Sequence, residues 1–482
     1  MKFSKRTLKT IQKRLSEPDF RFYAFVAFMV IVFFTGGGSR DDVQSLILLR
    51  PVAFLFCAYA LTVVAPGQWQ GRRFPLYIVG ALMALMILQL IPLPPSLWTE
   101  LPGRQIFADI ATIAGIDQPW RPLTMSPSKT LNSLFSMVVP AAAMMLYLNL
   151  DREYRRYALP VLLVLCSISA LWAVFQLVGP ARGPLYLYRI TNFGSGVGLF
   201  ANRNHQVVLL ASAIAMFGWY AASLKPSAKF SVLKYYGSIA AIFVLVPLIF
   251  ITGSRAGLLL MVPGLVFALF FLYFGRFNSE AISSGKSSGR SKIGPFTRRQ
   301  VILVVGIGAT LGLSILSVLL SRSLAYDRLF GGGELVELRL QLLPTLFKMT
   351  EDFFLWGIGF GSFEHVYKIY EPLELLRPNY LNQAHNDWLQ YPMEGGLPAV
   401  LIFLCALGWV STRLISLARN WRESGFTKYR AVMSFAVILF CLAASIGDYP
   451  LRVPSIMAIF ALLICVFSDS VDSVQRHDIK QR

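Results

Sequence analysis

The stretch "GSIAAIFVLVPLIFITGSRAGLLLMVPGLVFALFFLYF", residues 237–274, decides the class of fold. It holds two apolar blocks, 237–252 and 256–274. Each block has the length that an α-helix needs to cross about 30 Å of hydrocarbon. A helix pairs all its backbone polar groups within its own segment, so it is stable inside a bilayer. Because the turn between the blocks is minimal, the stretch predicts two antiparallel transmembrane helices in direct succession.

Apolar blocks of this kind recur along the whole chain. Of its 482 residues, 55% are hydrophobic and only 15% are charged, a balance that soluble domains rarely show. We therefore predict an all-α, polytopic transmembrane helical bundle of about twelve spans. The predicted spans are 22–36, 46–65, 75–92, 132–149, 158–177, 206–223, 237–252, 256–274, 301–320, 396–412, 430–447 and 454–469.

The distribution of charge predicts the orientation in the membrane. A formal net charge of +20 would suggest nucleic acid as the partner of a soluble protein, but the chain has no nucleic-acid-binding motif. Most of the 45 Lys and Arg residues fall in alternate loops, as they do in the cytoplasmic loops of membrane proteins. The pattern predicts that both termini are cytoplasmic, and that membrane lipids rather than nucleic acid surround the chain.

This topology divides the chain into five parts. Residues 338–349, "LRLQLLPTLFKM", carry apolar side chains at helical spacing inside a long external loop, which predicts a short amphipathic helix lying on the membrane. The five cysteines all lie in apolar blocks and are expected to be small buried hydrophobes. The parts are a basic cytoplasmic tail (1–21), nine transmembrane helices (22–320), the external loop (321–395), three further transmembrane helices (396–470) and a cytoplasmic tail (471–482).

Several polar side chains stand at the external ends of the predicted spans. Each also fits a plainer role: a helix cap, an arginine that reaches to the headgroups, or a local ion pair. The residues are Arg203 and His205 in "GLFANRNHQ" (198–206), Arg255 in "ITGSRAGLLL" (251–260), Arg339 at the start of the amphipathic helix, and Asp448 and Arg452 in "GDYPLRVPS" (447–455).

The topology would gather these side chains on one membrane face. Charge near a bilayer is costly and is usually functional. Guanidinium groups match phosphate oxygens in geometry and charge. The arginines therefore predict an anion site at the outer leaflet, suited to a lipid phosphate or diphosphate.

A further polar cluster lies in "YLNQAHNDWLQYPMEGGLP", residues 380–398, directly before a span. His385 is suited to accept a proton near neutral pH, with Asn386 or Asp387 holding its orientation. The plainer alternative is a His–Asn cap on the following helix. Gly395, Gly396 and Pro398 predict a tight turn that begins this helix. The chain shows no metal-binding pattern, and we expect neither a metal nor a cofactor.

These stretches resemble the O-antigen ligase and O-antigen polymerase superfamily of bacterial membrane glycosyltransferases. The resemblance covers roughly residues 190–410 and rests on "GLFANRNHQ", "TGSRAGLL" (252–259), residues 339–363 and "AHNDWLQYPMEGGLP" (384–398). The ligase signature looks like a histidine, a small polar residue, nine positions and Gly-x-x-Gly. Ala399 stands here where the last glycine is expected, which weakens the assignment as a ligase more than the assignment to the family.

The resemblance implies a function and roles for residues. It implies transfer of a glycan from undecaprenyl diphosphate at the periplasmic face of the bacterial inner membrane. The acceptor is a glycan, lipid A core or protein. Arg255 and Arg339 would hold the diphosphate and His385 would act at the acceptor, in an inverting and metal-independent reaction. Topology adds Arg203, His205, Asn386, Asp387, Asp448 and Arg452 as substrate-binding candidates.

Two other classes of function stay open. Twelve spans would also suit a transporter, although the polar residues stand at span ends rather than near the midplane where transporters bind their cargo. A non-catalytic partner in glycan assembly is the other alternative, and loss of activity on substitution of His385 would exclude it. The sequence does not distinguish a polymerase from a ligase.

Overall fold

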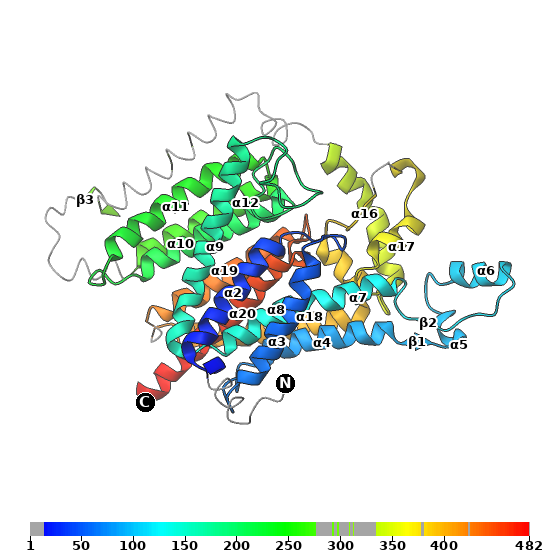
Figure 1. The fold of residues 1–482 in the computed structure, drawn as a ribbon, viewed down its shortest axis with the longest axis horizontal. Coiled ribbons are helices and arrows are strands. Elements are labelled where there is room, and N and C mark those ends of the chain that lie inside the picture. The colour runs from blue at the N-terminus through cyan, green and yellow to red at the C-terminus, as the bar shows by residue number, and fades with distance from the viewer. Residues whose placement is uncertain are drawn as a thin grey trace, which may run out of the picture.

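The computed structural model describes residues 14–275, 292–293, 296–297, 308, 312, 334–376, 380–422 and 425–481. Side chains of the short strands near residue 295, of 334–339 and of 475–481 are outside this description. The described chain is a polytopic helical bundle, as predicted (Figure 1).

Ten helices of the described part are long and apolar enough to cross a membrane. A further helix, α4 (Phe74–Leu90), is apolar but has only 17 residues. Every predicted span within the described residues coincides with one of these helices, whereas the span predicted over 301–320 falls almost entirely outside them. The ten are α2 (Pro18–Thr35), α3 (Leu46–Val63), α7 with α8 (Pro127–Ser136 and Val138–Leu148), α9 (Arg152–Val178), α10 (Arg203–Ser223), α11 (Ser231–Thr252), α12 (Arg255–Phe274), α18 (Asp387–Arg419), α19 (Thr427–Ala444) and α20 (Pro454–Gln481).

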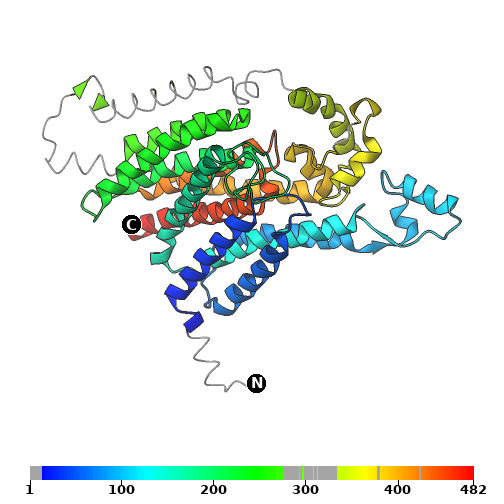
Figure 2. The same cartoon turned by 45° about the horizontal axis from the view of Figure 1, so that its top comes forward.

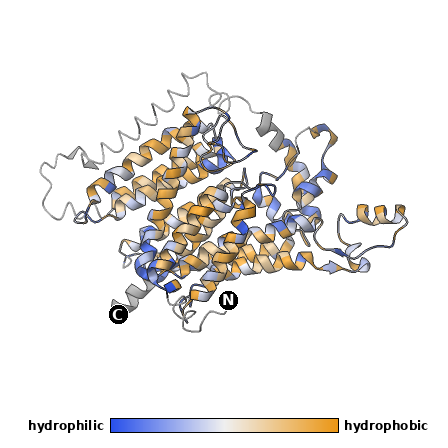
Figure 3. Cartoon of the chain, in the orientation of Figure 1, coloured by the Kyte–Doolittle hydropathy of each residue, from blue (hydrophilic) through white to orange (hydrophobic). Residues whose placement is uncertain are grey.

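Helix α10 lies in the interior of the bundle, with 89% of its apolar window buried. It packs against α9, α11, α12 and α19. Small residues permit the close approach: a Cβ added at Gly218 would lie 2.4 Å from the Cα of Ala268 in α12. Such small-residue contacts are the usual basis of helix association in membranes, where apolar side chains gain little by leaving lipid. Apolar residues run along the helices and hydrophilic residues gather at the helix ends (Figure 3).

The turn between α11 and α12 is as short as predicted. Gly253 ends α11 with φ +64°, a left-handed conformation that glycine adopts without strain. Ser254 then begins α12, because its Oγ accepts the N–H of Gly257 at 3.2 Å. Arg255 is thus the first residue of α12.

Helix α18 begins earlier than the sequence predicts. It starts at Asp387 rather than near Gly396, because the side chain of Asn386 caps it by accepting the N–H groups of Trp388 and Leu389. Gly396, with φ +65°, interrupts the helix at the predicted turn. The cap considered as the plainer alternative for the cluster is therefore present, beside the features described below.

A second apolar core lies outside the spans. It joins α16 (Glu334–Phe353), α17 (Phe363–Tyr370) and the start of α18. The amphipathic helix is confirmed, but its apolar face, with Leu342, Leu346 and Met349, is buried against protein rather than left for the membrane. The 3₁₀ helix η1 (Leu373–Leu375) follows α17.

The remaining elements are small. Strands β1 (Pro92–Leu93) and β2 (Arg121–Pro122) pair antiparallel, and with α5 (Pro95–Trp98) and α6 (Gln105–Ile113) they project from the bundle (Figures 1 and 2). Strands β3 (Lys292–Ile293) and β4 (Phe296–Thr297) form a second two-stranded pair. The 3₁₀ helix η2 (Pro450–Arg452) lies in the turn between α19 and α20.

The helix ends form two polar layers. At one end, called here the His385 end, backbone hydrogen bonds join Ser455 N–H to the Gly36 carbonyl at 2.9 Å and Ala201 N–H to the Gly37 carbonyl at 3.0 Å. At the opposite end, Asp469 of α20 lies among three guanidinium groups. Its oxygens are 2.9 Å from Arg155, 3.5 Å from Arg72 and 3.8 Å from Arg430.

Candidate active site

Asp448 is at the centre of the polar cluster at the His385 end. It lies in the short turn between α19 and α20 and is 4% exposed. Its Oδ2 accepts the side-chain N–H of Asn204 at 2.7 Å, and its Oδ1 accepts the backbone N–H of Tyr449 at 2.9 Å. Both oxygens are therefore fixed by hydrogen bonds, which sets the direction of the carboxylate.

His385 approaches Asp448 from the start of α18. Its Nδ1 lies 3.4 Å from Asp448 Oδ1, and its side chain is 21% exposed. The backbone of His385 has φ +51°, a left-handed conformation that costs energy in a residue other than glycine. Asp387, two residues further on, donates its backbone N–H to the carbonyl of Ser445 at 2.9 Å, which ties this strained turn to the end of α19. Strain held in place by the fold is typical of functional sites.

His205 approaches the same carboxylate from the start of α10. Its Nε2 is 3.8 Å from Asp448 Oδ1, longer than a hydrogen bond, and the residue is 1% exposed. The ring of Tyr449 contacts both imidazoles, with centroid distances of 5.4 Å to His205 and 4.8 Å to His385. Two histidines, one carboxylate and one tyrosine ring thus form a single cluster.

Hydrogen bonds connect this cluster to the α11–α12 turn. Ser254 Oγ donates to Asn204 Oδ1 at 2.9 Å, and the amide of Asn204 then donates to Asp448. The turn that carries Arg255 is therefore joined through two side chains to the carboxylate beside His385.

A buried ion-pair network lies beside the cluster. The guanidinium of Arg452 donates to Asp387 Oδ1 at 2.7 Å and to Glu394 Oε2 at 3.0 Å. Glu394 is fully buried, and its other oxygen accepts from Gln390 at 2.9 Å. The network joins the turn of η2 to the first two turns of α18, so it fixes the segment that follows His385.

Two of the remaining predicted arginines are the first residues of helices, whereas Arg339, predicted to open the amphipathic helix, is the sixth residue of α16 because that helix begins at Glu334. Arg203 is the first residue of α10, with its backbone N–H donating to Asn192 Oδ1 at 3.0 Å. Arg255 is the first residue of α12, half-buried. Arg339 lies in α16, which packs against α18, but its side chain is outside the described residues.

The local electrostatics favour an ionised Asp448. Burial would raise the pKa of this carboxyl, but the imidazoles of His205 and His385 hold the pKa well below its usual range. The carboxylate is thus negative throughout the neutral range and is suited to stabilise an imidazolium beside it. In the described part of the chain, no group of three or more His, Cys, Asp or Glu side chains is placed to hold a metal ion.

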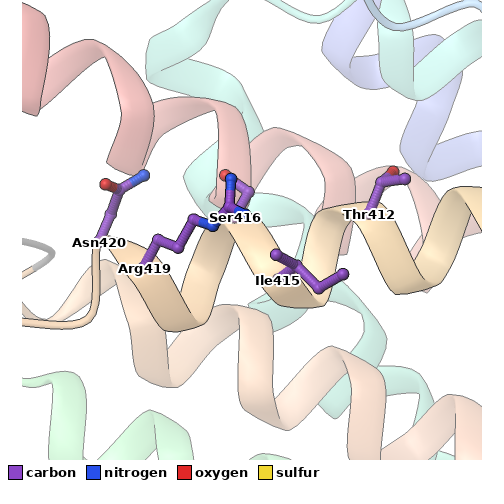
Figure 4. Close-up of a pocket in the computed structure, with 5 residues that line it drawn as sticks. All are labelled: Thr412, Ile415, Ser416, Arg419 and Asn420. Atoms are coloured by element: carbon purple, nitrogen blue, oxygen red, sulfur yellow. The ribbon is translucent and has the colours of Figure 1, made fainter.

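A separate hollow lies at the other end of α18 (Figure 4). Its lining includes Thr412, Ser416 and Arg419, which lie in the part of α18 that follows the kink at Gly396. From Leu397 to Arg419 this part rises about 33 Å at 1.5 Å per residue, about the thickness of a bilayer core. The hollow therefore belongs to the opposite membrane face and not to the cluster around Asp448.

Sequence reasoning placed His205, His385, Asp387, Asp448 and Arg452 on one face, and the structure brings these five together. Sequence reasoning did not identify the residues that connect these five. The connecting residues are Asn204, Ser254, Gln390, Glu394 and Tyr449. Glu394 could have been noticed, because a carboxylate next to Met393 and a double glycine at the start of an apolar span is unusual. Its partner could not, because Arg452 is 58 positions away along the chain.

The fold and site define a class of protein: a multi-pass helical membrane protein with a buried imidazole–carboxylate cluster at one membrane face. Residues 240–404, about a third of the chain, match the family model described as O-antigen ligase (Wzy_C). The matched segment includes Arg255, Arg339 and His385, whereas His205 and Asp448 lie outside it. No curated protein matches the chain at a significant level.

Proposed function

We propose that the protein transfers a glycan from undecaprenyl diphosphate to an acceptor hydroxyl at the periplasmic face of the bacterial inner membrane. The reaction is surface-polysaccharide polymerisation or ligation. The family match supports a lipid-linked glycan as substrate. The single observation that carries the proposal is the His385–Asp448 pair, held at 3.4 Å at the mouth of a membrane helix.

The imidazole–carboxylate pair gives His385 the role of general base. When His385 donates its Nδ1–H to Asp448, its Nε2 carries the lone pair. The acceptor hydroxyl transfers its proton to this nitrogen while its oxygen bonds to the anomeric carbon of the donor. The carboxylate of Asp448 stabilises the imidazolium that forms. A positioned base of this kind contributes about 10²–10⁴ in rate.

The arginines have the complementary role at the leaving group. As the bond from the anomeric carbon to the diphosphate breaks, negative charge develops on the diphosphate oxygens. Arg255 and Arg339, with Arg203 as a further ligand, would stabilise that charge. Displacement in a single step inverts the anomeric centre, and the protein groups named here perform it without a metal.

Arg452 has a different position in this scheme. Its guanidinium is engaged by Asp387 and Glu394, and it therefore fits a role in holding the start of α18 better than contact with a substrate. Asn386 likewise serves as the helix cap. We propose both as supporting residues rather than ligands.

The experiment that tests the function measures donor binding and transfer on the same purified variants. His385→Ala should lose at least about a hundredfold in transfer while still binding the lipid-linked donor. Arg255→Ala should lose both. The matched control is His365→Ala, because His365 is an exposed histidine of α17. Normal transfer by His385→Ala would exclude His385 as the base, and equal loss of binding and transfer would make it a donor ligand.

The membrane orientation requires its own test. We propose that the His385 end is periplasmic. In a chain whose five cysteines are replaced, Glu374→Cys near α17 should react with an impermeant thiol reagent added from the periplasm, and Ser227→Cys between α10 and α11 should not. Both positions are exposed. Labelling of Ser227→Cys alone would invert the topology and place the site in the cytoplasm.

A further inference from the structure

Two imidazoles face one oxygen of Asp448. His385 Nδ1 lies 3.4 Å from Oδ1, and His205 Nε2 lies 3.8 Å from the same atom. One carboxylate would suffice to orient one general base. The second imidazole is therefore a feature that base catalysis by His385 alone leaves unexplained.

The two imidazoles approach an oxygen of Asp448 that has little acceptor capacity left. Each carboxylate oxygen accepts about two hydrogen bonds. Oδ2 already accepts from Asn204, and Oδ1 already accepts the backbone N–H of Tyr449. About one position remains on Oδ1, and both imidazoles point at it. The two rings therefore compete for a single acceptor position.

His205 has a strong reason to take that position. The residue is 1% exposed, and neither of its ring nitrogens has a hydrogen-bond partner among the described residues. A buried polar group that lacks a partner costs about 1–3 kcal/mol. A shift of less than 1 Å would bring Nε2 into hydrogen-bond distance of Oδ1. His385 is more exposed, so it loses less when it releases the carboxylate.

We propose that His205 is a positioning residue that shares Asp448 with His385, and that its protonation withdraws the carboxylate from the base. This inference rests on the proposed function. While His205 is neutral, Asp448 orients His385 and leaves Nε2 able to accept the acceptor proton. Once His205 is protonated, its cationic N–H binds the carboxylate more strongly than a neutral imidazole does. The positive charge of His205 also opposes a second positive charge on His385.

The charged groups around the two imidazole rings leave Asp448 as the carboxylate that both rings share. The elements packed against α10 present Arg255 at the start of α12 and Arg452 in η2, and Arg203 opens α10 itself. Asp387 lies beside His385, but it is paired with Arg452. Asp448 is therefore the one carboxylate of the described residues within 4 Å of either imidazole, so an imidazolium on one ring weakens its support for the other.

The consequence is a rate that depends on two protonations on the acid side. One is protonation of the base His385, and the other is protonation of His205. Just below both, where the form with both histidines neutral still carries the rate, the logarithm of kcat should fall with a slope approaching 2 per pH unit. If His385 alone controlled the rate, the slope would approach 1.

The test is the pH dependence of kcat for the full-length protein with a lipid-linked glycan donor. His205→Asn and His205→Phe each remove the second titration, and the acid-side slope should fall from about 2 to about 1. The maximal rate of these variants should fall less than that of His385→Ala, because the base remains. His365→Asn, an exposed histidine of α17, should keep the slope of the unmodified protein.

The outcomes separate this inference from the proposed function. An acid-side slope that stays near 2 in both His205 variants would overturn the inference even if His385→Ala is inactive. A slope near 1 in the unmodified protein would overturn it as well. Full activity of His385→Ala would instead overturn the proposed function. If His205→Phe does not fold, His205→Asn alone decides, since it keeps a polar group beside Asp448.

Discussion

Replacing the carboxylate of Asp448 by an amide probes the candidate site most directly. Asp448→Asn keeps the shape of the side chain but removes its charge. If the new amide nitrogen takes the place of Oδ1, it opposes the backbone N–H of Tyr449. It also can no longer accept the Nδ1–H of His385, so His385 would have to carry its proton on Nε2 instead. If it takes the place of Oδ2, it opposes the amide N–H of Asn204. Both orientations therefore lose a hydrogen bond.

The size of the effect follows from the geometry. Opposite unit charges 3.4 Å apart attract by about 5 kcal/mol at an effective dielectric constant of about 20. Water reaches the partly exposed ring of His385 and screens this attraction, so we expect Asp448 to stabilise the imidazolium by about 3–4 kcal/mol. This corresponds to a decrease of about 10²–10³ in kcat.

The assay compares initial transfer rates of purified Asp448→Asn and unmodified protein at equal amounts of folded protein. Asp109→Asn in the exposed helix α6 is the matched control and should retain full activity. Donor binding should survive in both. A rate for Asp448→Asn within about threefold of the unmodified protein would refute the electrostatic role of Asp448.

The pH dependence of stability offers an independent check. The pKa of Asp448 is depressed in the folded protein, so its ionised form contributes stability above its unfolded pKa of about 4. That contribution is lost as the pH falls through the depressed value. The stability difference between the unmodified protein and Asp448→Asn should therefore shrink once the pH falls below about 4. A difference that persists unchanged far below that pH would contradict the assignment.

Three other changes test the supports of the site and the bundle. Glu394→Leu leaves the guanidinium of Arg452 with one carboxylate fewer and should lower the unfolding free energy by about 3–5 kcal/mol, seen as a lower Tm. Adding Arg452→Met should recover part of that loss, and simply additive losses would count against the pair. Asp469→Asn leaves three neighbouring arginines without their shared carboxylate and should also lower Tm, so an unchanged Tm would exclude that cluster as a structural support. Gly396→Ala forces a Cβ to within 2.7 Å of the Trp356 backbone at φ +65° and should destabilise, whereas Gly408→Ala in the same helix meets no atom within 4 Å and should not.

The arrangement of the candidate site was only partly open to prediction from sequence. Polar residues at span ends were visible because they interrupt apolar blocks. The sequence suggested that Asn386 or Asp387 orients His385, but the structure gives that position to Asp448, which is 63 residues away. It also suggested a local pair of Asp448 with Arg452, yet the described partners of Arg452 are Asp387 and Glu394. Hydrophobicity patterns carry no information about which turn meets which across a bundle.

The sequence by itself determined the class of fold and the position of almost every apolar span that the structure describes. A backbone N–H or C=O group without a hydrogen bond is strongly destabilising in hydrocarbon. A run of about twenty apolar residues is therefore stable there essentially only as an α-helix. The short turn around Gly253 followed from the same reasoning. Only the tertiary structure decided that the starts of α10 and α18 meet in the α19–α20 turn, where His205 and His385 share Asp448. Helix packing sets these contacts through small residues and buried hydrogen bonds between distant segments, and those specify partners only once the helices are assembled.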